Sequence, residues 1–180
     1  MTASSATPPR LPLVDAPDDP LARDIFGKLA AGRGILNLHR MMAYAPALLK
    51  ASGDMAIAFR DDAVLSRPLA EIAVLRAAQV VDCDYVFKRH LPLARAAGVS
   101  ERQIADIARW PDSAAFNAAQ KTALGYTEKV ARGAAVDDAS FASLRRDFSP
   151  REIVALTMLV AFYVSTATFI KALQVPDETE

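Results

Sequence analysis

Residues 71–90 have the sequence EIAVLRAAQVVDCDYVFKRH, and this stretch contains the pattern that decides the fold. Apolar residues recur at helical spacing on both sides of Asp82, without the strict alternation of a strand. Ser66 and Pro68 predict the start of the first helix, Asp82 is the expected N-cap of the second, and Gly98 is its expected end. The stretch therefore predicts two consecutive helices whose junction carries the reactive side chains.

The rest of the chain shows the same helical spacing and no turn signals typical of a sheet. Further helices are expected over residues 20–32, 36–44, 46–60, 101–110, 113–133, 137–148 and 149–173. A length of 180 residues suits one ordinary domain. We predict an all-α fold, with a single compact helical domain over residues 18–175, a flexible arm over 1–17 and a tail over 176–180.

The charge balance and the cysteine content exclude several classes of function. Lys and Arg together number 21, as do Asp and Glu, so the broad positive field that nucleic acids attract is missing. Cys83 is the single cysteine, which excludes an internal disulfide and a cysteine-rich zinc site and indicates a reducing, cytoplasmic location. Residues 1–20 lack the pattern of a secretory signal. We expect neither nucleic-acid nor membrane partners.

The last predicted helix contains 18 residues without a charge, from Ile153 to Ile170. That length meets the threshold for a membrane span, but three threonines and a serine favour a helix buried by its own domain or by a sister subunit. The apolar surface of this helix predicts a homo-oligomer, a dimer, trimer or hexamer, which replacement of Phe162 or Phe169 by Asp should dissociate or unfold.

Two of the predicted helices begin alike, which suggests a weak internal repeat. Residues 71–75 (EIAVL) resemble residues 152–156 (EIVAL), and each segment follows a serine and a proline. In this register Val164 corresponds to Cys83 and Lys171 to His90, so the second copy lacks the reactive groups of the first.

The segments RPLAEIAVLR (67–76) and CDYVFKRHLPLA (83–94), followed by AAGVS (96–100), resemble the signature of the carboxymuconolactone decarboxylase family, which includes the alkylhydroperoxidase D branch. The resemblance extends more loosely from about residue 20 to Leu173. It implies a compact all-α fold that assembles into homo-oligomers, commonly trimers or hexamers. It also implies a site in a cleft between the helices that carry Glu71 and His90.

In the peroxidase branch the signature is Glu, then 11 residues, then Cys-x-x-Cys-x-x-x-His. Glu71, Cys83 and His90 match it, but Val86 occupies the position of the second cysteine. Positions 86 and 90 are one turn apart, whereas 83 and 90 are two turns apart, about 10 Å along a helix axis. A redox mechanism would therefore use Cys83 alone, with an external thiol.

The resemblance assigns candidate roles to three residues: His90 would be the general acid or base, Glu71 would orient it or relay its proton, and Cys83 is the candidate thiol. From their apolar and aromatic character, Tyr85, Val86 and Phe87 are the candidate substrate contacts, and Trp110 could also line a pocket. Three alternatives stay open: Glu71 could pair with Arg67 four residues away, Cys83 could be a packed thiol, and Arg76 or Arg89 could hold a substrate carboxylate. His39 is expected to have an ordinary packing role.

These observations leave three functional hypotheses. The first is a carboxymuconolactone decarboxylase-like enzyme that carries out proton transfer on a small carboxylate-bearing molecule, by decarboxylation or a related lyase or isomerase step, without cofactor or metal. The second is a one-cysteine, alkylhydroperoxidase-like antioxidant activity of Cys83. The third is a non-catalytic oligomeric binding protein on an enzyme scaffold.

Overall fold

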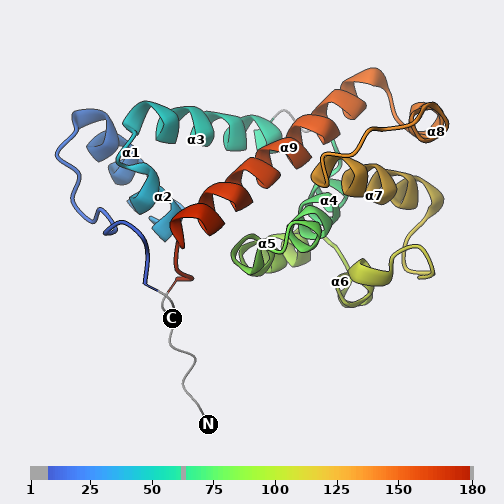
Figure 1. Cartoon of the computed structure of the whole chain (residues 1–180), viewed down its shortest axis with the longest axis horizontal. Coiled ribbons are helices and arrows are strands. Elements are labelled where there is room, and N and C mark those ends of the chain that lie inside the picture. Colours follow the sequence, from blue (N-terminus) through green and yellow to red (C-terminus); the bar gives the residue numbers. More distant parts are fainter. Residues whose placement is uncertain (1–7, 62–63, 179–180) are drawn as a thin grey trace, which may run out of the picture. The chain divides into compact units, whose positions relative to one another are not determined.

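The computed structural model describes residues 8–61 and 64–178, and the regular structure of these residues is helical throughout (Figure 1). The helices are α1 (Pro20–Ala30), α2 (Asn37–Met42), α3 (Pro46–Asp61), α4 (Arg67–Val80), α5 (Asp84–Ala96), α6 (Glu101–Asp106), the 3-10 turn η1 (Ile107–Arg109), α7 (Ala118–Ala131), α8 (Asp138–Asp147) and α9 (Pro150–Leu173). The prediction of an all-α fold is confirmed.

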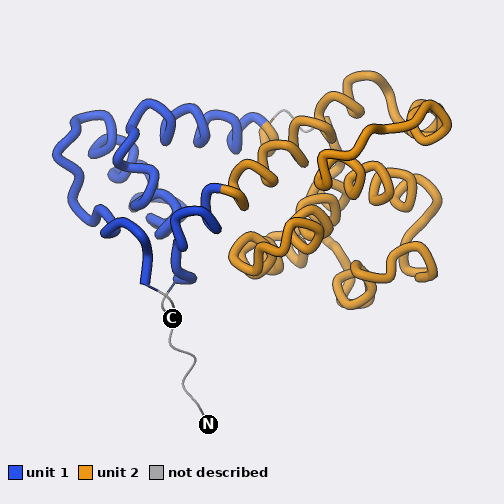
Figure 2. The backbone as a smooth tube through the Cα atoms, viewed as in Figure 1, with its two compact units in different colours: residues 1–58, 169–180 blue, residues 59–168 orange. Residues whose placement is uncertain are grey.

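The chain divides into two compact units, which Figure 2 distinguishes by colour. One unit combines residues 1–58 with 169–180, and the other spans residues 59–168. A small cluster of Phe26, Ala43 and Leu49 forms an apolar core in the first unit. The second unit contains every candidate site residue. The single domain expected over residues 18–175 stays a prediction.

The described part of the expected N-terminal arm makes specific contacts within the first unit. The Arg10 backbone N–H donates to the Leu173 carbonyl at 3.0 Å, and the Tyr44 hydroxyl donates to the Pro12 carbonyl at 3.0 Å. Val14 packs on the apolar core of this unit. Residues 1–7 of the arm lie outside the described residues.

The expected tail over residues 176–180 also contributes hydrogen bonds in its described part. The backbone N–H of Asn37, at the start of α2, donates to the Glu178 carboxylate at 3.0 Å. The Asn37 side-chain amide donates to the Pro176 and Asp177 carbonyls. These contacts satisfy backbone groups that a short helix leaves unpaired at its ends. Residues 179–180 lie outside the described residues.

Three helix starts occur where the sequence predicts them. The Asp19 carboxylate accepts from the backbone N–H groups of Leu21 and Ala22 at the start of α1. Capping boxes open α6, where Ser100 pairs with Gln103, and α9, where Ser149 pairs with Glu152. Each cap satisfies donors that the first helical turn leaves unpaired.

Two predicted helix starts are wrong. The helix expected from residue 113 begins at Ala118, because the Ser113 hydroxyl donates to Asp106 at 2.6 Å and accepts from the Ala115 N–H. Asn117 caps α7 instead, in a capping box with Gln120. Asp82 is not the cap of α5 either: its φ of 53° is left-handed, and Cys83 is the N-cap residue.

Helix α4 forms the centre of the second unit. It packs against α5, α7 and η1, and nine of its fourteen residues are buried. A helix buried on all sides is apolar all round rather than amphipathic. The buried carboxylate of Glu71 is the exception on this helix, so its partners decide how the charge is accommodated.

In the described chain α9 is the one helix long and apolar enough to cross a membrane by length and composition, and its most apolar window is 39% buried. A core helix of a soluble protein passes the same test. Val154 and Met158, one turn apart on α9, expose 62% and 46% of their surfaces. The helix therefore combines a buried face with an exposed apolar one.

Candidate functional site

The site begins with the turn that joins α4 to α5. After α4 ends, the left-handed backbone of Asp82 redirects the chain, and the Cys83 N–H donates back to the Ala78 carbonyl at 2.9 Å. The Cys83 carbonyl then accepts the first hydrogen bond of α5, from the Phe87 N–H. This reversal packs α5 on α4 and brings two side chains 19 residues apart into contact.

Those two side chains are Glu71 and His90. Nδ1 of His90 lies 2.8 Å from Oε2 of Glu71, and the side chains are only 11% and 5% exposed, respectively. Because both side chains are buried, neither can turn toward water without breaking the contact. When the carboxylate accepts from Nδ1–H, Nε2 is the nitrogen left for chemistry.

Arg67 contacts the second oxygen of the same carboxylate. Its Nη2 lies 2.8 Å from Oε1 of Glu71, one turn earlier on α4, and its side chain is 42% exposed. Arg67, Glu71 and His90 therefore form a continuous chain from a partly exposed guanidinium to a buried imidazole. The pairing of Glu71 with Arg67 and its contact with His90 occur together.

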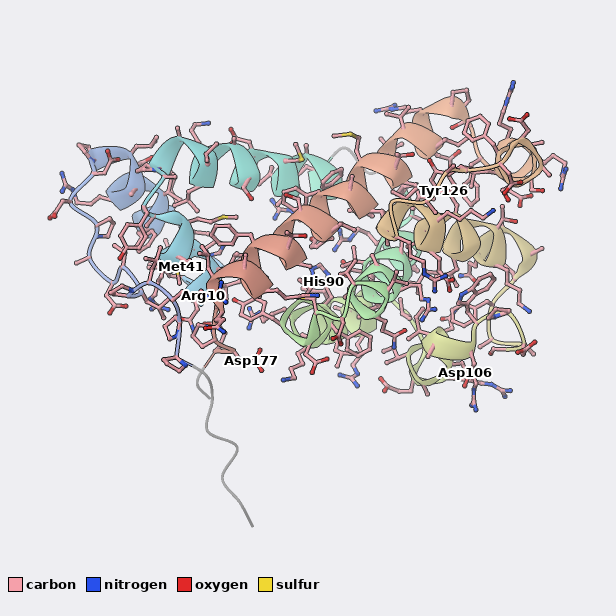
Figure 3. The ribbon with its side chains drawn as sticks, in the orientation of Figure 1. Arg10, Met41, His90, Asp106, Tyr126 and Asp177 are labelled. Atoms are coloured by element: carbon pink, nitrogen blue, oxygen red, sulfur yellow. The ribbon has the colours of Figure 1, made fainter. Side chains whose placement is uncertain are left out.

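An aromatic side chain from α9 contacts His90, the residue labelled in Figure 3. The Tyr163 ring meets the imidazole edge to face, with 4.7 Å between ring centroids. The ring of Tyr163 also contacts that of Phe162, with 5.3 Å between centroids, and the rings of Phe162 and Phe59 lie 5.6 Å apart between centroids. Sequence reasoning missed Tyr163, because it belongs to a helix whose pattern indicates only packing.

The other predicted site residues lie at the beginning of α5. Cys83, Tyr85 and Val86 are buried, and Phe87 is partly buried. Cys83 directly precedes α5 and lies seven residues before His90, about 10 Å of helical rise. The structure brings together Glu71 and His90, while the roles of Cys83 and its three neighbours stay predictions.

Two other residues considered at sequence level belong to a separate polar cluster. Arg76 Nε and Trp110 Nε1 donate to Oε1 of Glu128 at 2.8 and 2.6 Å. Burial by itself would raise the pKa of Glu128, but the hydrogen bonds from Trp110 and Arg76, with the nearby charges of Arg76 and Arg132, lower it below the ordinary value. Arg76 is thus committed to a structural ion pair.

The second histidine has a local structural contact. Nδ1 of His39, which is partly buried in α2, accepts a hydrogen bond from the Leu36 N–H at 3.0 Å. This geometry agrees with the packing role expected for His39. Within residues 8–61 and 64–178, no group of three or more His, Cys, Asp or Glu side chains is arranged to hold a metal ion.

Comparison with known proteins supports the resemblance seen in the Glu71 to His90 segment. The family model of the carboxymuconolactone decarboxylase family matches residues 45–129, which include both side chains. No curated relative matches the sequence. The family resemblance is confirmed over the region that forms the centre of the site.

Solved structures share the fold at low sequence identity. An uncharacterized peroxidase-related protein from Silicibacter sp. TM1040 is 19% identical with a TM-score of 0.82, over 99% of this chain and 96% of that one. A peroxidase-related protein from Ralstonia eutropha JMP134, described as an alkylhydroperoxidase AhpD core, is 18% identical with a TM-score of 0.81, over 96% and 94%.

A third similar structure is the debrominase Bmp8 in its apo form. It is 17% identical with a TM-score of 0.77, over 90% of this chain and 88% of that one. A cysteine-to-alanine variant of the same debrominase has been solved in complex with 2,3,4-tribromopyrrole. At these identities the three structures show a shared fold.

Proposed function

Because the region that carries Glu71 and His90 belongs to the carboxymuconolactone decarboxylase family, we propose that this protein is an enzyme that catalyses proton transfer on a small carboxylate-bearing molecule. The buried 2.8 Å contact between Glu71 and His90 carries the proposal. The reaction is a decarboxylation or a related lyase or isomerase step that needs no cofactor.

Each residue of the pair has a distinct role in this proposal. Nε2 of His90 exchanges a proton with the substrate, and Glu71 holds the ring through Nδ1 and balances the positive charge that His90 gains. In a decarboxylation, the electrons of the breaking C–C bond pass into a neighbouring carbonyl or double bond. The doubly protonated ring of His90 donates its Nε2 proton to the resulting carbanion or enolate and returns to the neutral form that keeps Nδ1–H toward Glu71, which completes the step.

The predicted substrate contacts come from the first turn of α5. Tyr85, Val86 and Phe87 offer apolar and aromatic surface on the same helix as His90. An apolar environment favours loss of CO₂, because it disfavours the charged ground-state carboxylate more than the delocalised transition state. These three side chains are therefore proposed to exclude water as well as to contact the substrate.

A second candidate function is thiol chemistry at Cys83. It is favoured by two neighbours described as peroxidase-related and by the debrominase whose cysteine variant was solved with a brominated pyrrole. In a one-cysteine peroxidase cycle, the thiolate attacks the peroxide oxygen, an alcohol leaves and a sulfenic acid forms. Two equivalents of an external thiol then return the sulfenic acid to the thiol with release of water.

Three variants distinguish these functions: His90→Ala, Glu71→Gln and Cys83→Ser. The two activities to measure are CO₂ release from a panel of small acids whose carboxylate lies next to a carbonyl or double bond, and dithiothreitol-dependent consumption of tert-butyl hydroperoxide. Proton transfer predicts a loss of ~10²- to 10⁴-fold in His90→Ala, a smaller loss in Glu71→Gln and almost none in Cys83→Ser.

Glu152→Gln is the matched control, because this carboxylate caps α9 at the position that corresponds to Glu71 in the internal repeat. Its activity should equal that of the wild type. If a folded Cys83→Ser variant loses turnover as completely as His90→Ala, the acid–base assignment fails and the thiol chemistry replaces it. If the panel gives no turnover but hydroperoxide does, the same conclusion follows.

The assembly and location complete the proposal. We infer a homo-oligomer that covers the exposed apolar face of α9, because Val154 and Met158 present large side chains to solvent on that helix. The single cysteine, which is buried, is compatible with the reducing cytoplasm. The expected partners are a small-molecule substrate and other copies of this chain.

A further inference from the structure

The position of Arg67 is not explained by the electrostatics of its own helix. Arg67 is the first residue of α4, where the positive end of the helix dipole disfavours a cation. A pair with the basic residue N-terminal to the acidic one is also the less favourable order for an i,i+4 contact. Its guanidinium nevertheless pairs with Glu71, at 2.8 Å.

The contact divides the Glu71 carboxylate between two neighbours. Oε1 lies 2.8 Å from the Arg67 guanidinium and Oε2 lies 2.8 Å from Nδ1 of His90. A guanidinium only donates hydrogen bonds, so Oε1 must act as an acceptor. With one oxygen fixed in this way, rotation of the carboxyl group about its terminal torsion would break the Arg67 contact. The other oxygen is thereby held toward the imidazole.

We propose that Arg67 is a positioning residue of the site: it fixes the Glu71 carboxylate so that Oε2 receives Nδ1–H of His90, which leaves Nε2 to exchange a proton with the substrate. Arg67 acts through Glu71. The inference rests on the proposed acid–base function of His90, but the arrangement of protons that it assigns can be measured without any substrate.

The second histidine supplies an internal reference. Nδ1 of His39 accepts from the Leu36 N–H, so the proton of a neutral His39 is on Nε2. Nδ1 of His90 donates to Glu71 in the proposed arrangement, so the proton of a neutral His90 is on Nδ1. The protein contains two histidines, and their neutral rings should therefore show opposite tautomers.

The experiment is long-range ¹H–¹⁵N correlation NMR of the full-length protein labelled at histidine, recorded as a pH series. The His39→Gln variant assigns the two sets of signals. The variants to compare are Arg67→Gln, which removes the charge and the donors, and Arg67→Lys, which keeps a charge. Arg89→Gln is the control, because it removes an exposed arginine one residue before His90 on α5.

In the wild type, neutral His90 should be protonated at Nδ1 and neutral His39 at Nε2. Arg67→Gln should convert His90 into a mixture of tautomers and change its pH profile, while the His39 signals stay unchanged. Arg67→Lys should restore part of the wild-type pattern, and the histidine signals of Arg89→Gln, recorded without substrate, should match those of the wild type. In turnover, Arg67→Gln should lower kcat with little change in KM.

Three results would overturn the assignment of Arg67: a neutral wild-type His90 protonated at Nε2, an Arg67→Gln variant with the wild-type tautomer and pH profile, or an Arg89→Gln variant that changes them equally. If Arg67→Gln does not fold, the Arg67→Lys variant, which keeps the charge, decides the question. Loss of the wild-type pattern in Arg67→Lys supports positioning by Arg67, and an unchanged pattern refutes it. Failure of the proposed function is a separate result, because a catalytically silent His90 would still show its tautomer.

Discussion

A double-mutant cycle on Glu71 and His90 tests whether their contact stabilises the fold as the geometry requires. The variants are Glu71→Leu, His90→Leu and the double variant. Each single substitution leaves one polar group buried without the partner that it meets at 2.8 Å. The double substitution removes both polar groups, so neither remains unpaired in the interior.

The expected magnitudes follow from burial. An unsatisfied buried hydrogen-bonding group costs about 1–3 kcal/mol, and a broken buried ion pair costs about 3–5 kcal/mol. His90→Leu leaves a buried carboxylate that keeps its contact with Arg67, so we expect a destabilisation at the low end of the ion-pair range, about 3 kcal/mol. Glu71→Leu leaves a buried imidazole without its partner, so we expect a destabilisation of about 2 kcal/mol. The double variant should cost less than the sum of the single variants by about 2 kcal/mol.

The measurement is urea-induced unfolding followed by far-UV circular dichroism at one fixed protein concentration, because assembly would make the stability depend on concentration. The control is the same cycle on Lys50 and Asp54, an exposed pair at 2.6 Å on α3 whose coupling should be near zero. Single variants of Glu71 and His90 that add within about 0.5 kcal/mol would refute the reasoning.

Two further predictions concern acid stability and assembly. The fold lowers the pKa of Glu128 below its ordinary value of 4.5, so the carboxylate contributes stability above that pH and loses the contribution as the pH falls toward the folded pKa. The melting temperature of Glu128→Gln should therefore lie below that of the wild type at neutral pH and approach it as the pH falls below 4.5, and a constant difference would contradict this assignment. Val154→Lys and Met158→Glu should reduce the sedimentation coefficient without unfolding the protein, since both side chains are exposed on α9, and an unchanged coefficient for both variants would exclude this face as the interface.

Helix starts could be predicted where a capping side chain binds backbone N–H groups of the first helical turn. The caps by Asp19 and Ser149 are predictable because each side chain contacts backbone groups two or three residues away. The helix expected over residues 113–133 begins later because the Ser113 hydroxyl binds Asp106, seven residues earlier. No local sequence pattern indicates that contact. Asn117 offered an equally valid cap, and the competing contact made by Ser113 decides which one is used.

The centre of the site could be predicted in part. The resemblance of one segment to the family signature implies that Glu71 and His90 line one site, and the local reversal between α4 and α5 brings the two side chains into contact. The contact of Tyr163 with His90 spans 73 residues and involves a helix that the apolar pattern assigns to packing. Nothing in that pattern distinguishes a tyrosine packed in a core from one that orients a histidine.

The two glutamates that correspond in the suggested repeat, Glu71 and Glu152, differ by two residues in their distance from the preceding serine. This difference decides whether the carboxylate caps its own helix. Glu152 lies three residues after Ser149, and one of its oxygens accepts from the Ser149 backbone N–H and hydroxyl. Glu71 lies five residues after Ser66, which makes no side-chain cap at the start of α4 in the described chain. Because no local cap uses the Glu71 carboxylate, one oxygen is available to Arg67 and the other to His90. Under the proposed function, the pairing of Glu71 with Arg67 is part of the role of this carboxylate and not an alternative to it.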